Sequence, residues 1–260
     1  MAVSILRHTV WRCPAKLRRA ALRLAPVRRA RRALYRPFGV RSLPVPGLGY
    51  RMRVDLEKFD QRAQLRVPYP EQYVVDHLRS VLRPGACGLD VGAYCGYFTL
   101  LMARGAGPSG RVFAFEPVPP NAAALRATLA LNELPNVAVV EAAVTDTPGT
   151  VTIRVAGPAS SVVGERGDPV VVEAVTIDGW AEASGLSAVD VVKLDVEGAE
   201  LAALRGMAST LRIHRPQLVV EVNDSTTQRE VEAWLGEAGY GTKIIGRAYH
   251  GAHLAAWPLT

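Results

Sequence analysis

From residue 70 onward, the spacing of apolar residues changes repeatedly between two periods. Stretches with a helical period alternate with short, almost continuously apolar runs, and Pro, Gly or Asn separate them. The first pattern predicts amphipathic helices and the second predicts buried strands. We expect helices over 70–85, 97–105, 120–132 and 227–239, and strands over 87–92, 111–117 and 136–144 and within 189–200 and 216–224. Such alternation predicts an α/β fold with a doubly wound, mostly parallel sheet.

Two segments depart from this alternation. Residues 149–176 are rich in β-branched residues, which predicts an inserted β-hairpin, and residues 43–56 alternate around Gly47 and Gly49, which predicts a short hairpin. Residues 1–45 are basic and have helical spacing, interrupted at Pro26. We therefore divide the chain into a basic helical N-terminal segment over 1–45 and one domain over 46–260.

The charge of the chain is unevenly distributed. Residues 1–54 hold fourteen Lys/Arg and no acid, whereas residues 55–260 hold seventeen Lys/Arg against twenty-four acids. Any affinity for phosphates or anionic lipid thus belongs to the front of the chain. Segment 1–45 fits three interpretations: a solvated helix on the domain, weak contact with a membrane surface or an acidic partner, and a transit peptide.

The cysteines, the apolar runs and the N-terminal residues indicate the cellular compartment of the protein. The three cysteines have no metal-type spacing, and their odd number argues against a disulfide scaffold. No run reaches the ~20 apolar residues of a membrane span, and no secretory signal is evident. We therefore expect a cytoplasmic protein.

Two glycines, Gly92 and Gly96, follow an acid, Asp90, at the end of the first predicted strand. Ligands of doubly wound sheets bind at the carboxyl ends of the strands, and glycine allows a ligand to approach the backbone closely. Glu116 ends the next strand twenty residues after Gly96, where a carboxylate can accept two hydrogen bonds from a ribose diol. These residues predict a nucleoside-binding site.

The residue between the glycines narrows the choice of cofactor. A dinucleotide fingerprint has the pattern G-x-G-x-x-G, but Tyr94 stands where its middle glycine would be. A side chain there disfavours a diphosphate. S-adenosyl-L-methionine (SAM) carries an adenosine and an amino acid but no phosphate, so the pattern favours SAM.

Four stretches resemble the successive signatures of the FkbM-type SAM-dependent methyltransferases: GLDVGAYCGYFTLLMA, GRVFAFEPVPPNAAALRATLALN, VDVVKLDVEGAE and HRPQLVVEV. The resemblance covers about residues 50–245. It implies a seven-stranded, Rossmann-like class I sheet whose last strand is antiparallel, with closing strands in 241–246 and 252–258. It also implies methyl transfer to a hydroxyl, typically of sugars or polyketide-like natural products. The family usually has Asn and Ile where this chain has Tyr94 and Cys95, which changes the floor beside the cofactor's methionine moiety.

Acids at the strand ends are the candidates for catalysis. Deprotonation of an attacking alcohol benefits from a base, and we name Asp195, Glu197 and Glu221 as candidates. By resemblance, Asp195 lies at the cofactor and substrate site, and Glu71 either faces the acceptor or caps a helix. The predicted cofactor-binding residues are Asp90, Gly92, Ala93, Gly96, Glu116, Pro117, Ala143 and Asp195.

The remaining reactive residues carry weaker indications. We interpret Cys95 as a wall residue, His214 as structural, and Glu200 as an acid at a helix N-terminus. His250 and His253 lie in a late hairpin that could line the site. No set of His and Asp indicates a metal, although clustered acids can hold Mg²⁺.

These features lead to a ranked set of functions. We expect a SAM-dependent methyltransferase that acts on a small-molecule hydroxyl, with the acceptor as partner and no nucleic acid. A nucleic-acid methyltransferase would use the basic front, but the acidic body would repel a nucleic-acid strand. A non-catalytic SAM-fold module that binds partners through its basic segment is the third alternative.

Overall fold

A computed structural model describes residues 39–67, 69–155, 168–247 and 251–260. The basic helical segment expected over 1–45 lies outside the described residues as far as residue 38. Its last residues differ from the expectation, because Val40–Pro44 form strand β1, which pairs antiparallel with β2 (Arg51–Asp55). The hairpin predicted over 43–56 is therefore confirmed, and it begins slightly earlier than expected.

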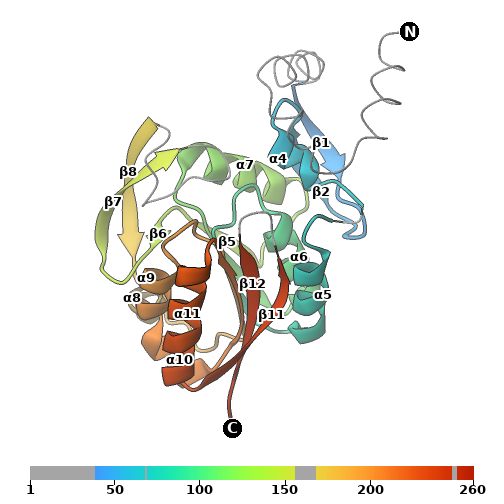
Figure 1. The fold of residues 1–260 in the computed structure, drawn as a ribbon. Coiled ribbons are helices and arrows are strands. Elements are labelled where there is room, and N and C mark those ends of the chain that lie inside the picture. The colour runs from blue at the N-terminus through green and yellow to red at the C-terminus, as the bar shows by residue number, and fades with distance from the viewer. Residues whose placement is uncertain (1–38, 68, 156–167, 248–250) are drawn as a thin grey trace, which may run out of the picture.

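A seven-stranded sheet forms the centre of the domain (Figure 1). Its order is β11-β12-β10-β9-β3-β4-β5, and β12 alone runs antiparallel to its neighbours. This arrangement confirms the predicted doubly wound sheet with an antiparallel last strand. The strands are β3 (Cys87–Val91), β4 (Arg111–Phe115), β5 (Val137–Val140), β9 (Val191–Leu194), β10 (Gln217–Val222), β11 (Tyr240–Arg247) and β12 (Ala252–Pro258).

Helices cover both faces of this sheet (Figure 1). One apolar core forms against α5 (Gln72–Val81), α6 (Tyr97–Ala106) and α7 (Pro119–Ala130). The other forms against α8 (Ile177–Ala183), α9 (Glu200–Arg205), α10 (Ala208–His214) and α11 (Ser225–Glu237). Successive strand residues point to opposite faces, so the almost continuously apolar strands supply both cores. A short helix, α4 (Phe59–Ala63), follows β2.

A second, three-stranded sheet has the order β6-β8-β7. It contains β6 (Ala143–Val144), β7 (Gly149–Val155) and β8 (Asp168–Val175), and the antiparallel β7–β8 pair confirms the predicted inserted hairpin. The single strand expected over 136–144 is wrong in its second half. The chain leaves the central sheet after Val140, and β6 pairs with β8 instead.

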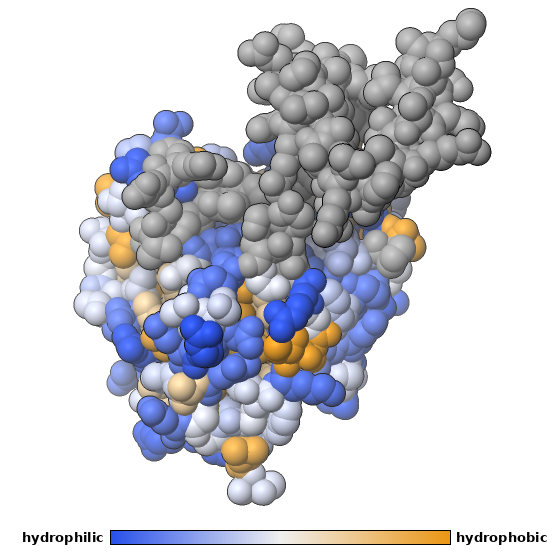
Figure 2. Space-filling model, in the orientation of Figure 1, coloured by the Kyte–Doolittle hydropathy of each residue, from blue (hydrophilic) through white to orange (hydrophobic). Residues whose placement is uncertain are grey.

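The described surface carries only scattered apolar side chains. The exposed large ones include Val67, Val171 and Ile213, which lie far apart in the chain, in a loop, a strand and a helix respectively. Figure 2 shows small apolar areas separated by hydrophilic residues on the visible part of one face. Among the described residues, no helix is both long and apolar enough to cross a membrane.

Candidate active site

A cavity of about 300 Å³ opens at the carboxyl ends of the central strands. Its walls come from the ends of β3, β4, β9 and β10 and from the turns after the first three, as expected for an open α/β sheet. Residues within 63–71 and 142–144 also contribute to the lining. The volume lies within the range of small-molecule sites. Among the lining residues are Tyr69, Glu71, Gly92, Ala93, Tyr94, Tyr97, Phe98, Glu116, Pro117, Asn121, Ala143, Lys193, Asp195, Glu197 and Glu221.

Gly92 is required by the crossing of two backbone segments. Its φ of 85° lies in the left-handed region, and a Cβ at this position would lie 1.7 Å from the carbonyl oxygen of Asp195. No side chain fits there. Gly92 therefore brings the turn after β3 against the end of β9, and the two segments form one continuous cavity floor.

Asp90 and Gly96 do not line the cavity, so our expectation of direct cofactor contacts for them needs correction. The Asp90 side chain is fully buried and accepts a hydrogen bond from the Thr99 hydroxyl at 2.6 Å. Gly96 caps α6 with a φ of 101°, and a Cβ on it would lie 2.5 Å from Leu125. Both residues hold the β3–α6 turn in shape from behind the cavity wall.

Glu116 lies in the cavity wall with most of its hydrogen-bonding capacity in use. Its carboxylate accepts hydrogen bonds from the backbone N–H groups of Tyr94 (2.8 Å) and Val118 (2.9 Å) and from the Asn121 amide (3.2 Å). Burial raises its pKa to about 7, although these donors act in the opposite direction. A carboxylate has about four lone-pair positions, so one remains for a ligand rather than the two that we expected.

Lys193 and Asp195 form the electrostatic centre of the cavity floor. The Lys193 ammonium donates to Asp195 at 2.9 Å, lies 3.9 Å from Asp90, and lies 5.0 Å from the centre of the Phe98 ring. Burial lowers the pKa of Lys193, but the Asp195 and Asp90 carboxylates outweigh it and leave the pKa above its usual value. Lys193 is therefore a cation that holds two carboxylates in place.

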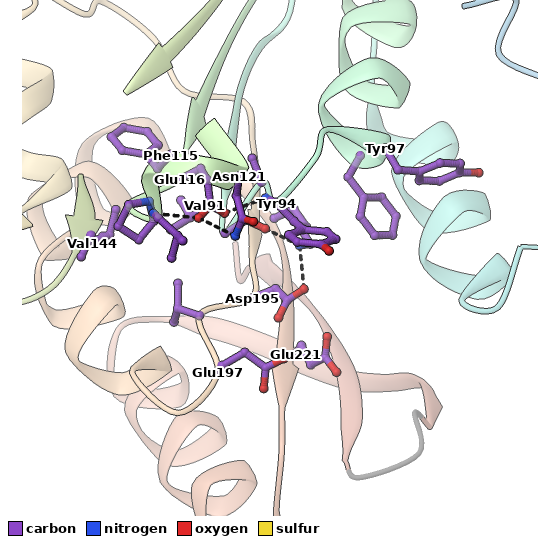
Figure 3. A pocket seen from close by; sticks show the side chains of 18 of the residues that line it. Val91, Tyr94, Tyr97, Phe115, Glu116, Asn121, Val144, Asp195, Glu197 and Glu221 are labelled. Atoms are coloured by element: carbon purple, nitrogen blue, oxygen red, sulfur yellow. Dashed lines mark hydrogen bonds and ion pairs between the residues drawn. The ribbon is translucent and has the colours of Figure 1, made fainter. Parts of the chain in front are cut away.

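Three further carboxyl groups surround Asp195. Figure 3 shows the side chains of Asp195, Glu197 and Glu221 pointing toward the same space. Burial, reinforced by Asp195, raises the pKa of Glu197 and of Glu221 to about 8. Burial and the Glu221 charge raise the pKa of Glu71 to about 7. Glu71 is the N-cap residue of α5, but its side chain makes no capping hydrogen bond. We call Glu71, Asp195, Glu197 and Glu221 the acid cluster.

Aromatic rings form the opposite wall. Tyr69 stacks on Tyr97 with ring centroids 3.9 Å apart, and Phe98 meets both rings edge-on. Tyr94 occupies a left-handed conformation with a φ of 51°, and its hydroxyl accepts a hydrogen bond from Gln61 at 3.3 Å. The fully buried Cys95 thiol donates to Gln64. Cys95 does not line the cavity and packs in the apolar core beside it.

The other reactive residues lie apart from the cavity lining. Glu200 begins α9, where its carboxylate accepts a hydrogen bond from the Gly198 N–H at 2.8 Å. His214 ends α10, and His250 lies outside the described residues. His253 is buried on β12, outside the cavity lining, and its Nε2 lies 3.2 Å from a carboxylate oxygen of Glu221 in the acid cluster. Within the described ranges, no three His, Cys, Asp or Glu side chains are arranged to hold a metal ion.

The comparisons with known proteins agree with this architecture. Residues 90–241, more than half of the chain, match the family model described as the methyltransferase FkbM domain. The chain belongs to the FkbM methyltransferase family. No curated protein matches it.

Solved structures resemble this FkbM methyltransferase in fold. The methyltransferase FkbM from Methylobacillus flagellatus KT has a TM-score of 0.51 at 19% identity, over 76% of this chain and 52% of that one. This chain thus spans about half of that relative's length. The METTL16 methyltransferase domain gives 0.52 at 12% identity, over 82% and 75%. The precorrin-6y C5,15-methyltransferase from Geobacter metallireducens GS-15 gives 0.50 at 15%, over 73% and 89%. At these identities the similarity shows the class I methyltransferase fold alone.

The structure of this FkbM methyltransferase brings most of the predicted site residues together. All of them line the cavity except Asp90 and Gly96. The sequence analysis missed Lys193, Asn121 and the aromatic wall of Tyr69 and Tyr97. Lys193 had a signal, because a lysine inside the apolar run VVKL needs a buried counter-charge. The tyrosines had none, because aromatic residues at helical spacing are typical of any core.

The raised pKa values of Glu71, Glu197 and Glu221 predict how stability depends on pH. These carboxyls ionise near pH 4.5 in the unfolded chain but at about 7–8 in the folded protein. Between these values the folded state binds more protons, so the free energy of unfolding should decrease as pH rises from about 5 to 8. Urea unfolding at pH 5.5 and pH 8 measures this change. Glu197→Gln should flatten the dependence, and stability that rises over this range in the wild type would contradict it.

Proposed function

We propose that this FkbM methyltransferase transfers a methyl group from SAM to a hydroxyl of a small molecule, a sugar or a polyketide-like compound. The observation that carries the proposal is that one cavity contains two kinds of group, one suited to bind a ribose and one suited to accept a proton. Glu116 lies in one part of the wall with a free acceptor position, and the acid cluster surrounds Asp195 in another. The reaction requires a hydrogen-bond acceptor for the ribose of SAM and a proton acceptor for the attacking hydroxyl in one cavity.

The residues present fit SAM. Gly92 and Ala93 leave the floor without bulky side chains, and Glu116 can accept one more hydrogen bond, from a ribose hydroxyl. Pro117 and Ala143 would contact the adenosine, and Asp195 would contact the positively charged methionine portion. When bound, SAM supplies an electrophilic methyl group on a sulfonium.

The residues of the chain orient the acceptor hydroxyl and provide the base. Displacement at a methyl group requires the acceptor oxygen in line with the bond that breaks, so orientation contributes much of the rate. Asp195, held by Lys193, would orient the acceptor hydroxyl and take its proton as the oxygen attacks. Glu197, Glu221 and Glu71 would hold other polar groups of the acceptor, and the aromatic wall would exclude water.

The acid cluster also argues against a nucleic-acid substrate. A phosphate backbone led to this cavity would meet five carboxyl groups, those of the acid cluster and of Glu116, and a single lysine among the lining residues. A polyhydroxyl acceptor instead offers O–H donors to the same oxygens.

Release of S-adenosylhomocysteine from SAM tests the proposal. The full chain is incubated with SAM and a panel of sugars, glycosides and polyketide alcohols, with RNA and DNA oligonucleotides as separate arms. We expect release with a hydroxylated small molecule. Release with an oligonucleotide alone, or SAM binding without release in any arm, would contradict the proposed function.

Glu116→Ala should weaken SAM binding. The variant loses one charge-assisted hydrogen bond to the ribose, which costs about 1.5–3 kcal/mol, or roughly tenfold to a hundredfold in Kd. Calorimetry measures the change. Asn121→Ala is the matched control, because it removes one partner of Glu116 but keeps the carboxylate and its two backbone donors. Equal losses in the two variants would contradict a direct role for Glu116.

A further inference from the structure

A buried histidine, His253, lies between the acid cluster and Tyr73 on α5. His253 lies in the otherwise apolar strand β12 and is only 1% exposed. Its Nε2 is 3.2 Å from a carboxylate oxygen of Glu221, and its Nδ1 is 3.3 Å from the Tyr73 hydroxyl. Glu221 in turn is hydrogen-bonded to Asp195. Asp195, Glu221, His253 and Tyr73 therefore form one continuous chain of polar contacts.

The strand register holds this chain in place. His253 lies directly opposite Glu221 in the β10–β12 pairing and opposite Gly246 in the β11–β12 pairing. A Cβ on Gly246 would lie 2.3 Å from the Tyr73 ring, so only glycine leaves room for that ring over β11. The register of β11 also shifts between Ile244 and Gly246. A glycine and a local irregularity in the sheet thus seat Tyr73 against His253.

The proposed reaction requires a path by which a proton can leave Asp195. When the acceptor oxygen forms its bond to the methyl carbon, the carbon–sulfur bond breaks and the hydroxyl loses one proton. Asp195 takes that proton in each turnover and must release it before the next one. Bound SAM and acceptor would cover Asp195 and block its access to bulk water, whereas Tyr73 on α5 lies outside the cavity lining and is only partly buried.

We propose that Glu221, His253 and Tyr73 form a relay that carries the product proton from Asp195 out of the cavity. This inference rests on the proposed function. Asp195 passes the proton to Glu221, and Glu221 passes its own proton to His253 Nε2. His253 then releases the Nδ1 proton to the Tyr73 oxygen, and the hydroxyl proton of Tyr73 goes to solvent. One proton enters and one leaves, so the relay is charge-balanced. His253 acts through Glu221 and is a positioning residue rather than a catalytic one.

The groups around His253 favour a neutral ring that can gain and lose a proton. Burial lowers the pKa of His253, and Lys193 on β9 acts in the same direction. Glu71 at the start of α5 and Asp195 after β9 act against it. The pKa of Glu221 is about 8, so this carboxyl holds a proton to pass on near neutral pH. Burial raises the pKa of Tyr73 to about 12, so its hydroxyl stays protonated and releases a proton only as it receives one from His253.

The first test needs no acceptor. In the full chain with ¹⁵N-labelled histidine, NMR reports each ring nitrogen separately. Glu221→Gln should shift the Nε2 resonance of His253, and Tyr73→Phe should shift the Nδ1 resonance. Tyr50→Phe, a change outside the cavity lining, should shift neither. If neither nitrogen resonance of His253 shifts in these two variants, the relay is overturned.

The second test uses an acceptor that supports release of S-adenosylhomocysteine by the wild type. Tyr73→Phe and His253→Asn should each lower kcat about tenfold or more near pH 7 with unchanged SAM affinity. Free imidazole should restore part of the rate in His253→Asn, which a structural defect would not allow. Tyr50→Phe should keep the wild-type rate.

The outcomes separate the relay from the reaction. Wild-type kcat and pH profile in both variants would overturn the relay and leave the proposed function standing. Absence of release in the wild type would overturn the proposed function, while the nitrogen resonances still decide whether the hydrogen-bonded chain exists.

Discussion

Asp195→Asn should fold and bind SAM but turn over about 10²–10⁴-fold more slowly, because the acceptor hydroxyl loses its base and its orientation. The amide keeps the shape of the side chain. It removes the closest counter-charge of Lys193, at 2.9 Å, so we also expect a lower free energy of unfolding. Single-turnover rates and SAM calorimetry on the same sample separate the two effects.

Glu197→Gln is the matched control for Asp195→Asn. It also neutralises one acid of the cluster, but it leaves the ion pair with Lys193 intact, and we expect a smaller loss of rate. If SAM affinity falls sharply in Asp195→Asn while the rate at saturation is kept, Asp195 belongs to cofactor binding, and Glu197 or Glu221 is the better base. Full activity of Asp195→Asn would contradict both roles.

Lys193→Met should destabilise the fold by about 3–5 kcal/mol, because loss of one partner leaves buried charge without compensation. Lys193 lies directly beside Asp90 in the β3–β9 pairing. One Asp90 oxygen is buried without a hydrogen bond and has the Lys193 ammonium 3.9 Å away. Urea unfolding measures the loss.

Lys243→Met is the control for Lys193→Met, since Lys243 lies exposed on β11. It should change stability little. Adding Asp90→Asn to Lys193→Met should recover part of the loss, because the second change removes the uncompensated carboxylate. An unfolding midpoint of Lys193→Met equal to that of the wild type would show that the buried lysine does not stabilise the fold.

The fold could be predicted from sequence because its signals are local. Short apolar runs such as 87–92 end at Gly or Pro, and each becomes a strand of a sheet covered on both faces. The exception is 136–144, whose apolar pattern continues past Val140 although the chain changes sheets. The pattern reports burial, and it cannot report which sheet buries a residue.

The site was predictable where it depends on strand ends. Glu116, Asp195 and Glu221 each lie at the carboxyl end of a parallel strand, so topology alone brings them to one edge. Side-chain direction was not predictable. Asp90 lies one residue before the end of β3, but its side chain points at Thr99 and Lys193. Gly96 leaves room for Leu125 where α6 begins.

Longer-range contacts were beyond the sequence. Lys193 and Asp90 are about a hundred residues apart in the chain and meet only because β3 and β9 are neighbours. Tyr73 and His253, 180 residues apart, meet only because Gly246 leaves room for the Tyr73 ring over β11. Neither pair has a spacing signal, since each depends on the order of strands in the sheet.

Titration of the full chain with SAM by calorimetry decides whether this cavity binds the cofactor. We expect saturable binding of one SAM per chain, and weaker binding to Glu116→Ala than to Asn121→Ala. Absence of saturable binding by the wild type would contradict the assignment of this cavity as a SAM site, and with it the proposed methyl transfer.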